Sequence, residues 1–426
     1  MNVRITKPIQ GGTIRAIASK SDAHRLLICA ALADGETFLD CPERSEDIDA
    51  TARCLEALGA AVRYERNGFC VRPIRRMIMQ ASGRRILDCG ESGSTLRFML
   101  PICGALGINS LFNMSGRLPE RPLSGLCDEM AAHGCKLSEP GASPMSCEGR
   151  LTSGSYALPG NISSQFISGL LFALPLLPGD SELLVTGVLE SRPYVDMTLD
   201  KLRLFGVKIF EDKNNAFRIP GNQSFCSPES VKVEGDWSNA AFWLAAGAMG
   251  QNGVSCTNLS LNSKQGDRAV AKLLSRFGAP VAYGDDFVTV LPGALRAIEI
   301  DAGDTPDLVP ILAAVASVSE GKTIIRNAGR LRIKESDRLR TIAATLSDLG
   351  ADVAQTEDGL CIEGKKELCG GETESFGDHR IAMAAAAVST VCREPVTIKG
   401  AEAVDKSYPG FWSDFKTSLN GEWEQC

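Results

Sequence analysis

The sequence has little histidine, no paired cysteines and no long apolar run. Its 426 residues include three histidines, His24, His133 and His379, and no two of them stand at a spacing typical of metal ligands. Its fifteen cysteines are scattered singly, without a CxxC pair, which favours buried thiols over a disulfide framework. We therefore expect no metal site and no cofactor.

Other absences narrow the class of protein. No apolar stretch approaches the roughly 20 residues that span a bilayer, and the first residues, MNVRITKPIQGG, lack the apolar core of a signal peptide. We therefore expect a cytoplasmic protein without a membrane partner. The formal net charge of −7 is unlike the basic excess of a nucleic-acid surface, so an anionic partner should be small. No GxxxxGK[ST] loop occurs, which disfavours a nucleotide-dependent kinase.

Internal repeats are plentiful. One repeated element is an amphipathic helix that ends in glycine and precedes two short strands, as in LGAAVRYERNGFCVRP from Leu58 and LGADVAQTEDGLCIEG from Leu349. The helix-ending glycines recur every 72 to 75 residues, at Gly59, Gly134, Gly206, Gly278 and Gly350. Because glycine suits the left-handed residue just past a helix, this period predicts a repeated helix and hairpin.

A second element repeats with a similar period. It is a polar loop followed by an apolar helix rich in alanine and leucine. Six copies begin 69 to 74 residues apart, near Ser21, Ser94, Ser164, Ser238, Asp307 and Asp378. Helices that are apolar on all sides are predicted to be buried, whereas the glycine-ended helices carry a polar face. The sequence therefore predicts an α/β fold of six modules, each with two helices and several strands.

The six modules divide into three plus three, because CSPES interrupts the pattern between Phe225 and Gly235. The strand expected at Val3 to Lys7 has no partner in the first half, so we assign the first dozen residues to the second half. We predict a first lobe of residues 13–227 and a second lobe of residues 1–12 plus 228–426, with a cleft and a hinge between them.

Basic residues gather where the predicted apolar helices begin. Free backbone N–H groups at a helix start bind anions, and the helix dipole adds to the attraction. The basic residues near these starts and in neighbouring loops are Lys20, Arg25, Arg97, Arg121, Arg192, Lys334, Arg338 and Arg380. Arginines beside proline or glycine suit a phosphate or a carboxylate. Glu335 lies among these cations, where a carboxylate suits proton transfer.

At these positions the sequence resembles the 5-enolpyruvylshikimate-3-phosphate synthase (3-phosphoshikimate 1-carboxyvinyltransferase) family over essentially the whole chain. Nine motifs in order carry the resemblance: Lys20-Ser21 with Arg25, ESGSTLR with Gly93 and Arg97, ERP with Arg121, SSQ at Ser163 to Gln165, SRPY at Ser191 to Tyr194, PD at Asp307, IKESDR from Ile333, DHR at Asp378 to Arg380, and DKSYPGF with Lys406. The resemblance implies a two-lobed inside-out α/β barrel, each lobe made of three βαβαββ repeats around buried parallel helices.

The resemblance also implies a reaction. The enolpyruvyl group of phosphoenolpyruvate passes to the 5-hydroxyl of shikimate 3-phosphate through a tetrahedral intermediate, in the shikimate pathway of aromatic amino acid biosynthesis. The shikimate 3-phosphate contacts implied are Lys20, Ser21, Arg25, Ser163, Ser164, Gln165, Ser191, Tyr194, Asp307 and Lys334. The phosphoenolpyruvate contacts implied are Lys20, Gly93, Arg121, Gln165, Arg338, Arg380 and Lys406, supported by Arg97, His379 and Glu91. We expect a monomer.

Catalytic roles follow from the same resemblance. Asp307 is expected as the base for the hydroxyl, and Glu335 as the proton carrier for the methylene carbon, assisted by Lys20. Lys406 is the alternative base. Glu91 and Arg330 stand where family members often have asparagine, and Ser94 and Phe98 differ in the loop that governs binding of the herbicide glyphosate, so sensitivity to it is open.

The residues at these motifs also bear on two alternative functions, a UDP-N-acetylglucosamine enolpyruvyl transferase and a non-catalytic anion-binding module. The UDP-N-acetylglucosamine enolpyruvyl transferases typically pair the early lysine with asparagine and carry a reactive cysteine in a mobile loop. Here Ser21 follows Lys20, and residues 116–122 contain no cysteine. A non-catalytic anion-binding module would show gaps among Lys20, Asp307, Glu335 and Lys406, and none of them is missing. The motifs therefore favour shikimate 3-phosphate as the acceptor.

Overall fold

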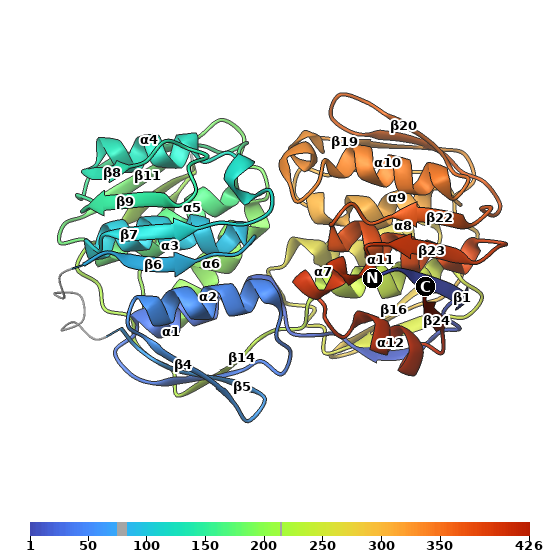
Figure 1. Cartoon of the computed structure of the whole chain (residues 1–426), viewed down its shortest axis with the longest axis horizontal. Coiled ribbons are helices and arrows are strands. Elements are labelled where there is room, and N and C mark those ends of the chain that lie inside the picture. The colour runs from blue at the N-terminus through green and yellow to red at the C-terminus, as the bar shows by residue number, and fades with distance from the viewer. Residues whose placement is uncertain (75–82, 214) are drawn as a thin grey trace. The chain divides into compact units, whose positions relative to one another are not determined.

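The structure, a computed structural model, describes residues 1–74, 83–213 and 215–426. The chain forms two compact units: Met1–Ser19 with Glu234–Cys426, here unit 1, and Lys20–Val233, here unit 2. Within the described ranges each unit contains three four-stranded sheets (Figure 1). The predicted α/β fold of six modules is thus confirmed. None of the helices in these ranges is long and apolar enough to cross a membrane.

One module of unit 2 shows the repeated unit in full. Its elements are β6 (Arg85–Asp88), α3 (Gly93–Leu106), β7 (Ser110–Asn113), α4 (Ser124–Ala132), β8 (Cys135–Leu137) and β9 (Met145–Gly149). Strands β6 and β7 are parallel, and β9 runs antiparallel to both β7 and β8, which gives the strand order β6-β7-β9-β8. This is the βαβαββ pattern that the family resemblance implied.

Two further modules have the same element order. The second module of this kind in unit 2 contains β10 (Ser155–Pro159), α5 (Ser164–Ala173), β11 (Ser181–Thr186), α6 (Arg192–Leu204), β12 (Phe210–Asp212) and β13 (Ala216–Ile219). Its counterpart in unit 1 contains β18 (Glu299–Asp301), α9 (Val309–Ala316), β19 (Lys322–Arg326), α10 (Arg338–Asp348), β20 (Asp352–Gln355) and β21 (Leu360–Glu363). In each, the first helix connects two parallel strands.

The module that begins unit 2 takes its first strand from the end of that unit. It contains α1 (Lys20–Leu32), β3 (Thr37–Asp40), α2 (Glu46–Ala57), β4 (Ala61–Glu65) and β5 (Gly68–Arg72). The strand parallel to β3 is β14 (Ser230–Lys232). Similarly, in unit 1 β2 (Gly12–Arg15) lies parallel to β15 (Val254–Thr257). The remaining elements of that module are α7 (Trp237–Met249), α8 (Ala269–Phe277), β16 (Val281–Tyr283) and β17 (Phe287–Val290).

These pairings place the unit boundaries differently from the boundaries expected from the sequence. Residues 13–19 belong to unit 1, and residues 228–233 belong to unit 2, whereas the sequence analysis assigned each segment to the other lobe. The reason is that each chain crossing follows a short strand rather than preceding it. Strands of three or four residues have too little alternation to be assigned to one sheet or another without their partners.

The last module is completed by the N-terminus. It contains β22 (Gly371–Glu374), α11 (His379–Val388), β23 (Val396–Lys399), α12 (Phe411–Thr417) and β24 (Glu422–Gln425). Strand β1 (Val3–Lys7) lies between β23 and β24 and is antiparallel to both, as Figure 1 shows beside the labels N and C. Val3 and Ile5 point into the core of unit 1, because alternate residues of a strand face the same side.

Each module buries one of its helices more completely than the other. Every residue of α7, α9 and α11 is buried. These three helices contact one another in the interior of unit 1. By contrast, α8 and α10 bury only one face, as amphipathic helices do. The prediction that the apolar helices are buried and the glycine-ended helices carry a polar face is confirmed in unit 1.

We expect Ile5→Ala to lower the free energy of unfolding by about 2–5 kcal/mol, because it leaves a cavity in the core of unit 1 beneath β1. Denaturant titration measures this change. Arg4→Ala is the matched control, since Arg4 is exposed in the same strand, and its effect should stay within about 0.5 kcal/mol. Equal effects of the two substitutions would show that β1 contributes no buried core.

Candidate functional site

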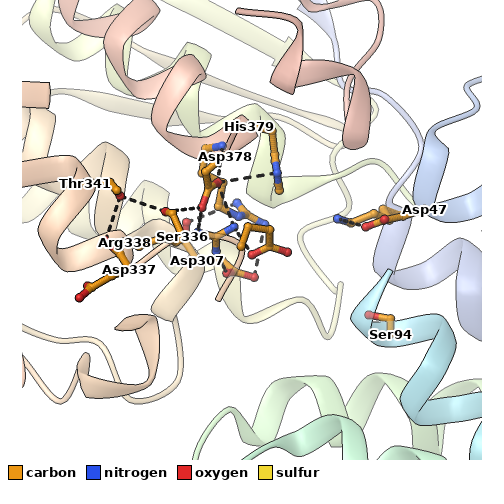
Figure 2. A network of polar contacts seen from close by, with 12 residues as sticks. Asp47, Ser94, Asp307, Ser336, Asp337, Arg338, Thr341, Asp378 and His379 are labelled. Atoms are coloured by element: carbon orange, nitrogen blue, oxygen red, sulfur yellow. Dashed lines mark hydrogen bonds and ion pairs between the residues drawn. The ribbon is translucent and has the colours of Figure 1, made fainter. Parts of the chain in front are cut away.

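In unit 1, three carboxylates surround one buried arginine. Arg338 is the first residue of α10, and its Nη1 donates to Asp307 Oδ1 at 2.8 Å, its Nη2 to Glu335 Oε2 at 2.8 Å, and its Nε to Asp378 Oδ2 at 2.7 Å. Asp307 lies in the 3-10 helix η5 (Pro306–Leu308), and Asp378 is the N-cap of α11. Figure 2 shows Asp307, Arg338 and Asp378 turned toward one another from separate elements. We call Asp307, Glu335, Arg338 and Asp378 the Arg338 cluster.

Further cations and an imidazole adjoin this cluster. Arg380 Nη2 lies 3.3 Å from Asp307 Oδ2, and Arg380 Nη1 donates to the Asp307 backbone carbonyl at 3.3 Å. His379 Nδ1 lies 3.8 Å from Asp378 Oδ1. Lys406 is buried at the end of the 3-10 helix η8 (Ala401–Lys406), which packs against α11. Residues predicted from three separate motifs are therefore in direct contact in unit 1, and the element that carries Lys406 packs against α11.

Charges within the cluster shift the pKa values of Asp307 and Arg338. Burial by itself would raise the pKa of the Asp307 carboxyl, but Arg380, Lys334 and Arg338 hold that pKa well below its usual range. Burial would lower the pKa of Arg338, but the carboxylates of Asp378, Glu335 and Asp307 hold it above its usual range. Asp307 is therefore an ionised, weakly basic carboxylate while these cations remain its partners.

Lys334 directly follows the 3-10 helix η6 (Gly329–Ile333) and precedes Glu335. Burial is the largest influence on this ammonium group and lowers its pKa to about 8, although Asp307 acts in the opposite direction. A lysine with such a pKa still carries a proton on most copies of the protein at neutral pH. Lys334 is thus able to bind an anion or a hydroxyl oxygen as a cation.

In unit 2, Lys20 and the neighbouring His24 are connected to α2. Lys20 Nζ lies 2.9 Å from Asp47 Oδ2. His24 Nδ1 is 2.7 Å from Thr51 Oγ1, and Thr51 Oγ1 is 2.7 Å from Thr95 Oγ1 in α3. Burial lowers the pKa of His24 to about 3, so the imidazole is neutral at physiological pH. These contacts fix the start of α1 against two other helices.

Arg25 is held in one orientation by α1 and α6. Its Nε donates to Thr198 Oγ1 at 2.9 Å, its Nη1 to the Ser21 carbonyl at 2.6 Å, and its Nη2 to the Tyr194 carbonyl at 2.9 Å. Burial lowers the pKa of this guanidinium to about 10, which leaves it charged at neutral pH. Three of the residues that the resemblance implied as shikimate 3-phosphate contacts, Ser21, Arg25 and Tyr194, are therefore joined by direct contacts.

The start of α3 brings two arginines against one glycine. A Cβ atom at Gly93 would lie 3.0 Å from Arg121 Nη1 and 3.1 Å from Arg97 Nη1, so a side chain at this position would crowd both guanidinium groups. Arg97 Nη1 donates to Gln165 Oε1 at 2.6 Å, and Gln165 Nε2 donates to Ser94 Oγ at 2.7 Å. The starts of α3 and α5 are thus joined in a cationic, hydrogen-bonding surface suited to a phosphate.

The predicted serines lie at the starts of α5 and α6. Ser163 is the N-cap of α5, and its Oγ accepts from Gln165 N at 3.2 Å, while Ser164 is the first residue of the helix. Ser191 precedes α6 in the left-handed conformation, with φ of 54°, and is buried. Such a conformation is uncommon for serine and often marks a functional position.

The two departures from the family pattern have local partners. Glu91 Oε1 accepts from Arg117 N at 3.2 Å in unit 2. Arg330 Nη2 donates to the Gly303 carbonyl at 2.7 Å in unit 1. Both side chains are thus engaged by the protein backbone, Glu91 as an acceptor and Arg330 as a donor.

Two acidic residues of these networks were not assigned a role from the sequence. Asp47 lies in the first turn of α2, and Asp378 caps α11. In the sequence, both are ordinary acidic residues at helix starts. Such residues stabilise a helix whether or not a ligand binds there. Only their contacts with Lys20 and Arg338 distinguish them.

The described residues form no metal-ligand group, and the cysteines are free thiols. Across residues 1–74, 83–213 and 215–426, no three His, Cys, Asp or Glu side chains are grouped to hold a metal ion. The fifteen cysteines are free thiols, and most of them are buried, with Cys226, Cys369 and Cys426 exposed. The interpretation of most cysteines as small buried side chains is therefore confirmed.

Lys334 is expected to lose its proton near pH 8 in the protein without substrates. Its usual pKa is 10.5, so between about pH 8 and 10.5 the unfolded chain binds more protons than the folded chain. The contribution of Lys334 to the free energy of unfolding is therefore fully present above about pH 10.5 and is lost as the pH falls to about 8. A ¹³C NMR titration of lysine ε-carbons measures the pKa, with Lys334→Met to assign the signal. Titration near pH 10.5 would contradict the expectation.

Comparison with known proteins agrees with this arrangement. The family model described as EPSP synthase (3-phosphoshikimate 1-carboxyvinyltransferase) matches residues 3–415. A 3-phosphoshikimate 1-carboxyvinyltransferase from Clostridium kluyveri is 44% identical over 412 residues, which cover 96% of this chain and 95% of the relative. A protein of the same description from Clostridium acetobutylicum is 45% identical over 422 residues, covering 99% and 97%.

Solved structures show the same fold. The structure of EPSP synthase from Acinetobacter baumannii superposes with a TM-score of 0.83 at 26% identity and covers 100% of both chains. The enolpyruvyl transferase NikO from Streptomyces tendae has a TM-score of 0.79 at 19% identity, covering 99% of this chain and 98% of NikO, which is a likeness of fold alone. The chain therefore belongs to the EPSP synthase (3-phosphoshikimate 1-carboxyvinyltransferase) family.

Proposed function

We propose that the protein is a 3-phosphoshikimate 1-carboxyvinyltransferase. It transfers the enolpyruvyl group of phosphoenolpyruvate to the 5-hydroxyl of shikimate 3-phosphate and releases phosphate, as a step of the shikimate pathway. The observation that carries this proposal is the identity of 44–45%, over nearly the full length, with relatives of that description. We also propose that the protein acts in the cytoplasm as a monomer.

The charge of the two substrates explains why the protein needs so many cations. Each substrate carries a phosphate and a carboxylate, so bringing both together opposes about four to six negative charges at short range. Unit 2 supplies the side chains of Lys20, Arg25, Arg97 and Arg121, and unit 1 supplies those of Lys334, Arg338, Arg380 and Lys406. We propose that both sets act on the same pair of substrates, in the cleft expected from the sequence.

The shikimate 3-phosphate contacts are proposed to lie mainly in unit 2. Ser163, Ser164 and Gln165 stand at the start of α5, where backbone N–H groups favour a phosphate. Arg25 is already oriented by three hydrogen bonds, so little side-chain entropy is lost when it binds an anion. The other proposed contacts are Lys20, Ser21, Ser191 and Tyr194 in unit 2, with Asp307 and Lys334 in unit 1.

The phosphoenolpyruvate contacts are proposed to come from both units. Gly93 and Arg121 meet at the start of α3, with Arg97 behind them as support. From unit 1, Arg338 and Arg380 present guanidinium groups that now bind Asp307. The remaining proposed contacts are Lys20, Gln165 and Lys406. An incoming anion competes with Asp307 for the two arginines.

The proposed chemistry is an addition followed by an elimination. The 5-hydroxyl oxygen forms a bond to C2 of phosphoenolpyruvate and loses its proton, while C3 gains a proton and becomes a methyl group. The tetrahedral adduct then loses phosphate from C2 and a proton from C3, which restores the double bond. We propose Asp307 as the base for the hydroxyl and Glu335 as the carrier of the C3 proton, with Lys20 assisting and Lys406 as the alternative base.

The low pKa of Asp307 is consistent with a base that acts only in the loaded enzyme. Arg380, Lys334 and Arg338 hold the pKa of its carboxyl down in the protein without substrates. When substrate anions bind these cations, their influence on Asp307 weakens, and its pKa rises toward the usual range. The carboxylate then becomes a stronger proton acceptor next to the hydroxyl it is proposed to deprotonate.

Purified protein should release inorganic phosphate when phosphoenolpyruvate is supplied together with shikimate 3-phosphate. A coupled phosphate assay measures the rate, and UDP-N-acetylglucosamine in place of shikimate 3-phosphate is the comparison acceptor. We expect release only with shikimate 3-phosphate. Release only with the sugar nucleotide would overturn the proposed acceptor.

Glu335→Gln is expected to lower kcat by about two or more orders of magnitude while leaving both substrate KM values nearly unchanged, because glutamine cannot carry the C3 proton. Steady-state kinetics measure both parameters. Glu363→Gln, at an exposed position of β21 in the same unit, is the matched control and should retain full activity. Equal losses of binding and turnover at Glu335 would indicate a positioning role instead.

A further inference from the structure

Asp378 differs in burial from the other two carboxylates of the Arg338 cluster. Its side chain has no exposed surface, whereas the side chains of Asp307 and Glu335 remain 15% and 12% exposed. Asp378 also caps α11, a helix in which every residue is buried. A ligand can therefore reach the side chains of Asp307 and Glu335 but not that of Asp378.

The oxygen atoms of Asp378 are already occupied by the protein. Its Oδ2 accepts from Arg338 Nε at 2.7 Å and from Ser336 Oγ at 3.0 Å. Its Oδ1 accepts from Arg338 Nη2 at 3.2 Å and from Arg380 N at 3.0 Å. A carboxylate offers about four lone-pair sites, so these four donors use its accepting capacity. Figure 2 shows Ser336 and Arg338 reaching Asp378 together.

We propose that Asp378 is a positioning residue for phosphoenolpyruvate, an inference that rests on the proposed function. It holds one edge of the Arg338 guanidinium through two parallel hydrogen bonds, and it fixes the backbone of Arg380 at the start of α11. One buried carboxylate thus holds the guanidinium of one arginine proposed to bind the donor substrate and the backbone of the other.

The geometry of the guanidinium explains why this anchor matters. A bidentate pair of this kind sets the plane of an arginine as well as its position. With the Nε edge held by Asp378, Nη1 is directed at Asp307, and Nη2 is shared between Asp378 and Glu335. A substrate anion can then replace Asp307 and Glu335 without rotation of Arg338. Asp378 remains in place while the two proposed catalytic carboxylates change partners.

Asp378→Asn separates positioning from simple charge balance, because the two effects have opposite signs. Asparagine still caps a helix, but it loses the charge and one of the two accepting oxygens. If Asp378 positions the arginines, the KM for phosphoenolpyruvate should rise about tenfold or more, with the KM for shikimate 3-phosphate changed by less than about twofold. If Asp378 only balanced charge, its removal would strengthen the attraction for an anion, and the KM for phosphoenolpyruvate would fall.

Asp337→Asn is the matched control. Asp337 caps the neighbouring helix α10 through Arg340 N and pairs with Arg332 at 3.2 Å, so it combines a helix cap with an arginine pair as Asp378 does. It binds neither Arg338 nor Arg380 through these contacts. We expect both KM values of Asp337→Asn to remain near those of the unaltered protein. A similar rise for both variants would mean that helix capping alone explains the effect, and would overturn the proposal.

Ser336→Ala is the second variant, needed if Asp378→Asn does not fold. It removes one hydrogen bond from Asp378 and keeps the charge, so the KM for phosphoenolpyruvate should rise about two- to fivefold without loss of the folded state. A lower melting temperature with unchanged KM in the folded variants would show a purely structural role and overturn the proposal. Inactivity of the unaltered protein with both substrates would overturn the proposed function itself. An active protein with unchanged KM values in the variants overturns only the role of Asp378.

Discussion

The complete burial of α7, α9 and α11 is the constraint on which the charged cluster of unit 1 depends. A helix that is apolar on all sides must be enclosed, yet its first backbone N–H groups still require acceptors. At the start of α11 that acceptor is Asp378. A buried carboxylate needs a counter-ion in turn, and Arg338 at the start of α10 provides it. The packing of one helix thus accounts for the first ion pair of the cluster.

The ion pairs of the cluster differ in what they accomplish. A buried ion pair gains little net stability over apolar packing, because both charges lose their hydration. The contacts of Arg338 with Asp307 and Glu335 leave those carboxylates partly exposed, so a ligand is able to compete for the arginine. Preorganised charges of this kind favour the binding of anions, because the arginine has already been oriented and desolvated during folding. The arrangement therefore suits function better than stability.

Arg25 in unit 2 is held by hydrogen bonds to neutral groups, unlike Arg338 in unit 1. Arg25 is oriented by two backbone carbonyls and a threonine hydroxyl rather than by carboxylates. Its charge is therefore not neutralised by these three contacts, and burial lowers its pKa only to about 10. Gly93 achieves close approach of Arg97 and Arg121 by having no side chain.

The sequence by itself determined the six-module α/β fold and the positions of the charged helix starts, because period and composition are local properties of the chain. The glycines from Gly59 to Gly350 and the motifs around Lys20, Gly93 and Arg338 required no structure to be found. Only the tertiary structure decided that β2 and β14 close sheets away from their sequence neighbours, and that Asp378 holds Arg338. Both outcomes depend on contacts between residues far apart in the chain. The sequence of a four-residue strand does not indicate which strand it pairs with, and a helix-capping aspartate does not indicate which arginine it binds.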